Sequence, residues 1–257
     1  IVENSDGRLW VNDVNGLYLF DPETGKRSLA GPEVRGLRSI YVDVRGDVWV
    51  GASDGLWRME HSTGLIVHYK HDPDSPNSLS DNRVDALLSD NAGRLWVGTQ
   101  GGLDLFDRAQ NRFVHYRYDP ADRYSLSDDL VFSLHEDRSG VLWIGTDRGL
   151  SKYSWTANRF TLYTRLPVAS PDTGPSLETS GLQSLSSERV MAVREDRQGI
   201  LWVGMLVGGL NRLDRTAGTL TVYRNDPTDP DSLSSDIVRK IYEDRSGTLW
   251  VGTELGL

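Results

Sequence analysis

The stretch "NAGRLWVGTQGGLDLFD", residues 91–107, consists of two short apolar runs, each preceded by a glycine-containing turn. The first run is centred on Trp96, and the second ends in Asp107. Related phrases recur along the chain, each with a tryptophan at the same place: Trp10, Trp49, Trp96, Trp143, Trp202 and Trp250. The separations of 39, 47, 47, 59 and 48 residues indicate an internal repeat, which has to be recognised before any other signal is interpreted.

Each repeat predicts four short strands bounded by turn residues, which we name strands A to D. In the clearest copy they are "RVDALLSD" from Arg83, "RLWVGT" from Arg94, "GLDLFD" from Gly102 and "RFVHYRY" from Arg112. No run in the repeat is long enough for a crossover helix, so the strands are expected to pair antiparallel. Strand C is apolar on both faces, as expected when sheets stack on one another. The sequence therefore predicts an all-β fold: a β-propeller of four-stranded antiparallel blades, with six repeat units in one region, 1–257, of a ring of seven or more blades.

The A–B turns share an acidic residue three positions before their glycine. An Asx side chain there can accept a hydrogen bond from its own backbone two residues on, while the glycine supplies a positive φ. We predict a purely structural turn role, without metal or catalysis, for Asp43, Asp90, Asp137, Asp196 and Asp244. The glutamates that precede three of them, Glu136, Glu195 and Glu243, are expected on the solvated surface.

Composition excludes several function classes. The net charge is −9 and the 28 basic residues are scattered, which argues against a nucleic-acid partner. There is no cysteine, so disulfides, thiolate metal sites and thiol nucleophiles are excluded. No segment has the ~20 apolar residues of a membrane span, and the first residues do not resemble a signal peptide. Because six A–B units but only five C–D units are present, we expect the sequence to be part of a longer chain.

A second phrase recurs between strands D and A. It reads "HDPDSPNSLSDNRV" from His71, "YDPADRYSLSDDLV" from Tyr118 and "NDPTDPDSLSSDIV" from Asn225, and a shorter copy, "SLSSERV", starts at Ser184. The proline ends strand D because it cannot donate to the ladder. The leucines between the serines are expected to pack between blades: Leu79, Leu126, Leu185 and Leu233.

Taken together, the two phrases resemble the two-component regulator propeller repeats, and the resemblance covers essentially the whole chain. In that family the propellers form the sensor part of membrane-anchored signalling proteins, together with a β-sandwich, one membrane span and a cytoplasmic histidine kinase or diguanylate cyclase. The resemblance implies a periplasmic, non-catalytic module without a cofactor. Its implied partners are an unknown small molecule, which for some relatives is a carbohydrate breakdown product, neighbouring propeller or β-sandwich domains, and a second copy. A membrane would be contacted only through a span that this sequence does not contain.

Candidate ligand contacts are expected where the copies of the repeat disagree. Positions six and three before the turn aspartate are uniformly apolar, whereas the position five before it varies. We predict that these variable residues lie at the mouth of a central channel and bind the ligand: Arg38, Asp85, Phe132, Met191 and Arg239. Drift without function is the alternative explanation.

Two further departures from the repeat concern the loops on the same predicted face. The connection "TRLPVASPDTGPSLETSGLQ" from Thr164 is about a dozen residues longer than its counterparts, which favours either function or disorder. The next B–C turn is apolar and places Met205, Leu206 and Val207 where polar residues are usual. We predict that these three contact a partner, with packing against the long loop as the alternative.

Two other functions stay open. A propeller that only docks other proteins would explain the apolar turn. A glycan-active hydrolase or lyase would need converging carboxylates, and Asp85 is the one carboxylate among ten channel-proximal positions of strand A. The five histidines do not form a recognisable metal site or nucleophile motif, although a triad assembled across blades is compatible with the sequence.

Overall fold

The structure is a computed structural model that describes residues 2–4, 6–13, 16–29, 31, 34, 36–155, 157–163 and 184–257. Over this part of the chain all regular elements are β-strands, and none is a helix. The all-β prediction is therefore confirmed. The long connection that starts at Thr164, residues 164–183, lies outside the described residues.

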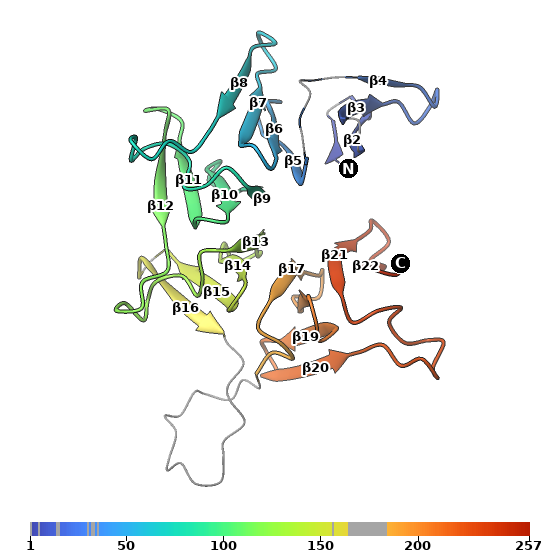
Figure 1. The fold of residues 1–257 in the computed structure, drawn as a ribbon. Helices are drawn as coiled ribbons and strands as arrows, with labels where there is room; N and C mark the ends of the chain where they lie inside the picture. The colour runs from blue at the N-terminus through green and yellow to red at the C-terminus, as the bar shows by residue number, and fades with distance from the viewer. Residues whose placement is uncertain are drawn as a thin grey trace. The chain divides into compact units, whose positions relative to one another are not determined.

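The strands form six sheets, which we call blades 1 to 6 in chain order (Figure 1). The chain divides into two compact units, and each is described by itself. The first unit, residues 1–118 with 129–131, holds blades 1 to 3, each of four strands. Blade 1 contains β1 (Val2–Glu3), β2 (Leu9–Asp13), β3 (Gly16–Phe20) and β4 (Arg27–Leu29). Blade 2 contains β5 (Ser39–Val42), β6 (Val48–Gly51), β7 (Leu56–Met59) and β8 (Ile66–Tyr69). Blade 3 contains β9 (Val84–Ser89), β10 (Leu95–Thr99), β11 (Leu103–Asp107) and β12 (Arg112–Tyr116).

The second unit, residues 119–128 with 132–257, holds blades 4 to 6. Blade 4 contains β13 (Val131–Glu136), β14 (Leu142–Thr146), β15 (Gly149–Ser154) and β16 (Arg159–Tyr163). Blade 5 contains β17 (Val190–Glu195), β18 (Leu201–Met205), β19 (Leu210–Asp214) and β20 (Thr219–Tyr223). Blade 6 is described as two strands, β21 (Val238–Glu243) and β22 (Leu249–Thr253).

Within each blade the strands lie in sequence order, so that every connection is a hairpin. In blade 3, for example, Trp96 of β10 pairs with Leu88 of β9 on one side and with Leu105 of β11 on the other. The four strands of this blade agree with the predicted strands A to D to within two residues at each end. Short antiparallel sheets of this kind are the blades of a β-propeller, and the predicted fold class is confirmed.

The repeated tryptophans form the core because strand B is covered on both faces. Trp49, Trp96 and Trp143 are fully buried. In the first unit Trp49 of blade 2 packs in one cluster with Leu79 and with Leu95 of blade 3. Leu79 and, in the second unit, Leu185 thus pack between blades as expected. Leu126 is also buried, whereas Leu233 is half-buried. A single sheet cannot bury both of its faces, which is the physical reason for repeating the unit.

The glycine after the buried strand B tryptophan allows neighbouring blades to approach closely. A Cβ atom added to Gly145 would lie 2.6 Å from Cγ1 of Val190, which begins strand A of the next blade. A Cβ atom added to Gly51 or to Gly204 would lie at the same distance from Cγ1 of Val84 or of Val238, respectively. No real Cβ atom tolerates such a contact, so the glycine is required by packing and not by backbone conformation.

Candidate functional site

The turn aspartates hold both the A–B turn and the core tryptophan. Oδ1 of Asp137 accepts the backbone N–H groups of Ser139 at 2.9 Å and Val141 at 3.0 Å, and Oδ2 accepts the indole N–H of Trp143 at 2.8 Å. The other four aspartates make the same three kinds of hydrogen bond: Asp43, Asp90, Asp196 and Asp244. Burial alone would raise the pKa of Asp137, but these bonds and one from Arg215 outweigh it and lower the pKa to about 2. Both oxygens of each turn carboxylate thus accept hydrogen bonds from the protein itself.

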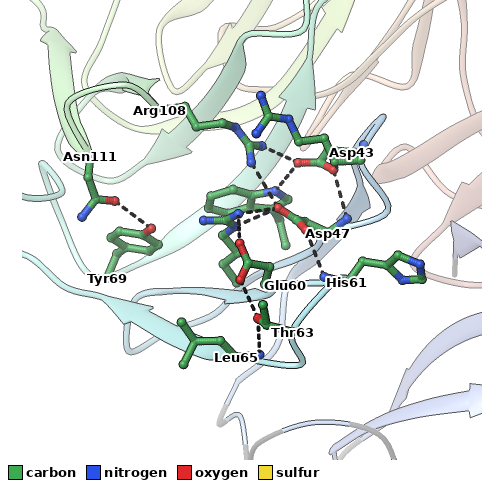
Figure 2. Close-up of polar contacts among 12 residues, drawn as sticks. Asp43, Asp47, Glu60, His61, Thr63, Leu65, Tyr69, Arg108 and Asn111 are labelled. Carbon is green, nitrogen blue, oxygen red and sulfur yellow. Dashed lines mark hydrogen bonds and ion pairs between the residues drawn. The ribbon is translucent and has the colours of Figure 1, made fainter.

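In the first unit an arginine of blade 3 joins the turn of blade 2. Figure 2 shows Arg108 directed at Asp43 and Asp47, and Nη1 lies 3.1 Å from Oδ2 of Asp47. Arg58 of blade 2 pairs with the same Asp47 oxygen at 2.6 Å. Both guanidinium groups lie 5.5 Å from the ring of Trp49. The arrangement is a latch between blades in which the indole lies beside two arginines that are each paired with carboxylates.

The second unit repeats this latch between blades 4 and 5. Nη1 of Arg215 lies 2.5 Å from Oδ2 of Asp137, and Nη2 pairs with Glu195. Glu195 also accepts the backbone N–H of Arg138 at 2.8 Å and is only 8% exposed. The expectation that Glu195 lies on the solvated surface is therefore wrong, and it is also wrong for Glu243, whose side chain is 8% exposed and accepts the backbone N–H of Arg197. The charge of Glu195 is stabilised in the blade interface by two donors from other turns, which the sequence spacing did not reveal.

Three of the five variable residues of strand A lie where the strand pairing is interrupted. In blade 3 Ala86 pairs with Gly98 and Val84 with Thr99, so Asp85 between them is the extra residue of a β-bulge. Met191 in blade 5 and Arg239 in blade 6 occupy the same bulge position. Bulges redirect a side chain out of the regular pleat and are frequent next to binding sites. The backbone thus frees these side chains from the packing that fixes their neighbours.

The structure brings together two of the five predicted ligand contacts. Nη1 of Arg38 lies 3.1 Å from Oδ1 of Asp85 in the first unit. In the second unit Phe132 and Met191 are half-buried, whereas Arg239 is exposed and pairs with Glu254 at 3.3 Å. Sequence reasoning did not select Arg83, whose Nε lies 3.1 Å from Oδ2 of Asp85. Arg83 could have been selected from its position two residues before Asp85, because side chains two residues apart lie on the same face of a regular strand.

The apolar B–C turn of blade 5 is only partly available to a partner. Val207 is 63% exposed, and Leu206 is half-buried. Met205, by contrast, is fully buried in the cluster of Trp143 and Leu201. The prediction that Met205 contacts a partner is wrong, because this residue is the last of strand B and its side chain belongs to the blade interface.

The histidines with described partners are engaged in structure. His115 Nδ1 lies 2.7 Å from Oδ1 of Asp104, and its Nε2 lies 2.9 Å from the carbonyl of Pro76. The hydrogen bond with Asp104 raises the pKa of His115. His135 is neutral near pH 7, since burial lowers its pKa to about 4, and its Nε2 accepts the backbone N–H of Glu195 at 2.9 Å. Among the described residues no group of three or more histidines and carboxylates could hold a metal ion.

A cavity of about 550 Å³ lies between blades 5 and 6 in the second unit. Its apolar lining includes Trp202, Tyr223 and Leu249. At the equivalent place in the first unit, Trp49 and Tyr69 of blade 2 are covered by aromatic residues of strands C and D of blade 3, Phe106 and Phe113. The lining therefore corresponds to a blade-packing surface, and we do not assign a ligand to it.

Comparison with known proteins agrees with this architecture. The family described as "Two component regulator propeller" matches residues 78–101, 125–148, 184–206 and 232–254. Each match runs from the "SLS" phrase to just beyond strand B, and so covers part of the residues that carried the resemblance, without strands C and D. Four segments of the chain thus match the two component regulator propeller repeat, and the resemblance predicted from the sequence is confirmed. A search of curated proteins returned no match.

Solved structures show the same fold at low sequence identity. The extracellular domain of the hybrid two component system BT4673 from B. thetaiotaomicron is 18% identical, with a TM-score of 0.80, over 99% of this chain and 31% of that one. The corresponding domain of BT3049 from B. thetaiotaomicron is 21% identical, with a TM-score of 0.57, over 100% of this chain and 38% of that one. Virginiamycin B lyase from Staphylococcus aureus is 16% identical, with a TM-score of 0.68, over 100% of this chain and 77% of that one. The chain spans about a third of the length of the two extracellular domains. No helix in the described part of the chain is long and apolar enough to cross a membrane.

Proposed function

We propose that this chain is the periplasmic, ligand-sensing propeller of a bacterial transmembrane signalling protein of the two-component type. The observation that carries the proposal is the set of four two component regulator propeller repeats. The likeness of fold to extracellular domains of hybrid two component systems supports the extracytoplasmic location. The output would be a histidine kinase or a diguanylate cyclase across the membrane, reached by a change in domain orientation when ligand binds.

The propeller itself would be non-catalytic. Its turn carboxylates are occupied by turn and tryptophan N–H groups, and His115 and His135 are occupied by Asp104 and by a backbone amide. A general acid or base needs a free position within hydrogen-bond reach of a substrate, and the engagement of these groups within the protein supports a non-catalytic role. Ligand contacts would instead come from the bulge residues of strand A and from Arg38.

A thermal-shift screen of mono- and oligosaccharides, amino acids and organic acids tests the sensing role. We expect a saturable rise in melting temperature with at least one compound, because a ligand that binds only the folded state stabilises it. The rise should disappear in Phe132→Ala or Arg239→Ala and persist in Leu162→Ala, a change of an exposed residue on the outer strand β16.

Two alternatives make different predictions in the same screen. The lyase-like fold neighbour favours an enzyme, which would change the mass of the added compound within the incubation. The exposed Val207 favours a docking propeller, which would show no shift with any small molecule but would bind another domain or a second copy. Either result would contradict the sensing role.

A further inference from the structure

Arginines form ion pairs with acidic residues in several places in the first unit, and the number of arginines relative to carboxylates differs between these places. In the latch around Trp49, Arg58 and Arg108 share three carboxylates: Asp43, Asp47 and Glu60. Acidic groups are therefore in excess there. Each guanidinium already faces two carboxylates, so the latch has no charge to offer a ligand.

The cluster around Asp85 has the opposite ratio. Arg38 of blade 2 and Arg83 of blade 3 both pair at 3.1 Å with this one carboxylate. Among the ion pairs of the described residues, neither arginine has a second acidic partner. Asp81, the acidic residue that precedes Arg83 in the sequence, accepts the backbone N–H of Arg83 at 2.7 Å and forms no ion pair with its guanidinium among the described residues.

The three side chains of this cluster differ in burial: the carboxylate is nearly buried, and the two arginines are partly exposed. The side chain of Asp85 is 9% exposed, whereas those of Arg38 and Arg83 are 35% and 36% exposed. Each guanidinium has five N–H donors in a rigid fork, and one carboxylate cannot use them all. With its amide oriented to accept, Gln100 takes a further bond from Nη1 of Arg83 at 2.9 Å. The buried carboxylate thus positions two cations that are themselves partly exposed.

From this geometry we infer that Arg38 and Arg83 bind an anionic group, a carboxylate or a sulfate carried on a small polar ligand, with Asp85 as the residue that positions them. The inference rests on the proposed sensing role and specifies the ligand class. Two forked cations around a single buried anion match the planar oxygens of a carboxylate or the oxygens of a sulfate. Of the residues at the equivalent positions in the second unit, Phe132 and Met191 carry no charge and Arg239 already pairs with Glu254, so the anion preference belongs to the first unit.

The test is an NMR titration of the ¹⁵N-labelled protein, observing the arginine Nε–H signals. The probes are sodium sulfate and D-glucuronate, with D-glucose as the neutral counterpart of glucuronate. We expect saturable shifts of the Arg38 and Arg83 signals with at least one anion and none with glucose. Affinity should fall at least tenfold in Arg38→Met and in Arg83→Met. It should be unchanged in Arg112→Met, a control with similar exposure that pairs with Asp107 on the outer part of blade 3.

The possible failures are distinguishable. Shifts that grow linearly with salt and appear equally at Arg112 would indicate general screening and would overturn the inference. Saturable binding of a neutral compound that Arg38→Met leaves unchanged would overturn the anion preference but would leave the sensing role intact. A screen without any ligand, neutral or anionic, would overturn both. Sulfate and glucuronate titrations together decide whether the favoured group is a sulfate or a carboxylate.

Discussion

The close approach of blades 4 and 5 predicts a large difference between two glycine-to-alanine substitutions at the same motif position. In Gly145→Ala the new Cβ would press on Oγ of Ser133 in the same blade, a side chain that can rotate, and would lie 2.6 Å from Cγ1 of Val190 and 3.0 Å from its backbone oxygen. In Gly252→Ala of the same 257-residue chain, at the same place in blade 6, the nearest atoms are Cβ and the backbone oxygen of Lys240, at 3.6 and 3.7 Å. Both glycines lie in strand B outside the positive-φ region, so backbone strain does not distinguish them.

The magnitude follows from the cost of overpacking a dense interior. One extra methyl group in a filled interface costs about 1–3 kcal/mol, and the backbone oxygen of Val190 cannot rotate out of its way. For a chain of this size each kcal/mol lowers the melting temperature by roughly 2–4 °C, so Gly145→Ala should lose about 2–12 °C. Gly252→Ala should be neutral or slightly stabilising, because alanine restricts the unfolded chain without a clash in the folded one.

Thermal unfolding followed by circular dichroism, on both variants and the parent protein at equal concentration, measures this difference. A melting temperature of Gly145→Ala within about 1 °C of the parent would refute the reasoning, as would an equal loss in both variants. The first result would mean that the blades move apart without cost. The second would mean that glycine is needed for some property of the strand itself.

Three other outcomes are expected. Arg108→Met should lower the free energy of unfolding, measured in urea, by about 2 kcal/mol, because it leaves half of the remaining latch charges uncompensated. The control Arg112→Met should change this free energy by less than about 0.5 kcal/mol, and equal effects of the two variants would contradict the latch. Burial lowers the pKa of His135 from 6.5 to about 4, so stability should be complete above pH 6.5 and fall by about 3 kcal/mol toward pH 4. His135→Gln should remove that part of the pH dependence, and an unchanged slope would show that the histidine is protonated without penalty. Met205→Asp should unfold the protein or lower its stability by several kcal/mol, whereas Val207→Asp should leave stability nearly unchanged, as thermal melts of both will show.

The fold could be predicted because its determinants are local and repeated. A strand pattern, a turn aspartate and a glycine recur at fixed spacing, and each copy supports the interpretation of the others. The hydrogen bond from the indole N–H to the turn aspartate could also have been predicted, because the aspartate precedes the tryptophan by six residues in each copy, as in Asp43 and Trp49. Nothing in that spacing depends on how one blade packs against the next.

The contacts between blades were not predictable in the same way. The partners Arg108 and Asp43 are 65 residues apart, and Arg215 and Asp137 are 78 apart. Such pairs depend on the placement of neighbouring sheets and leave no local pattern. The same cause explains the error at Met205, where an apolar turn residue in the sequence proved to be the buried end of strand B.

The bulge explains how this repeat can keep its stability while its recognition changes. Residues on either side of it, such as Val84 and Ala86, pair with the neighbouring strand and are buried between blades. The bulged residue is left out of that ladder, so a substitution there leaves the pairing of the strands in place. Asp85 and Arg239 can therefore differ in charge although their backbones are equivalent. A ligand site built on such positions can diverge from copy to copy while the strand pairing of the blade is kept.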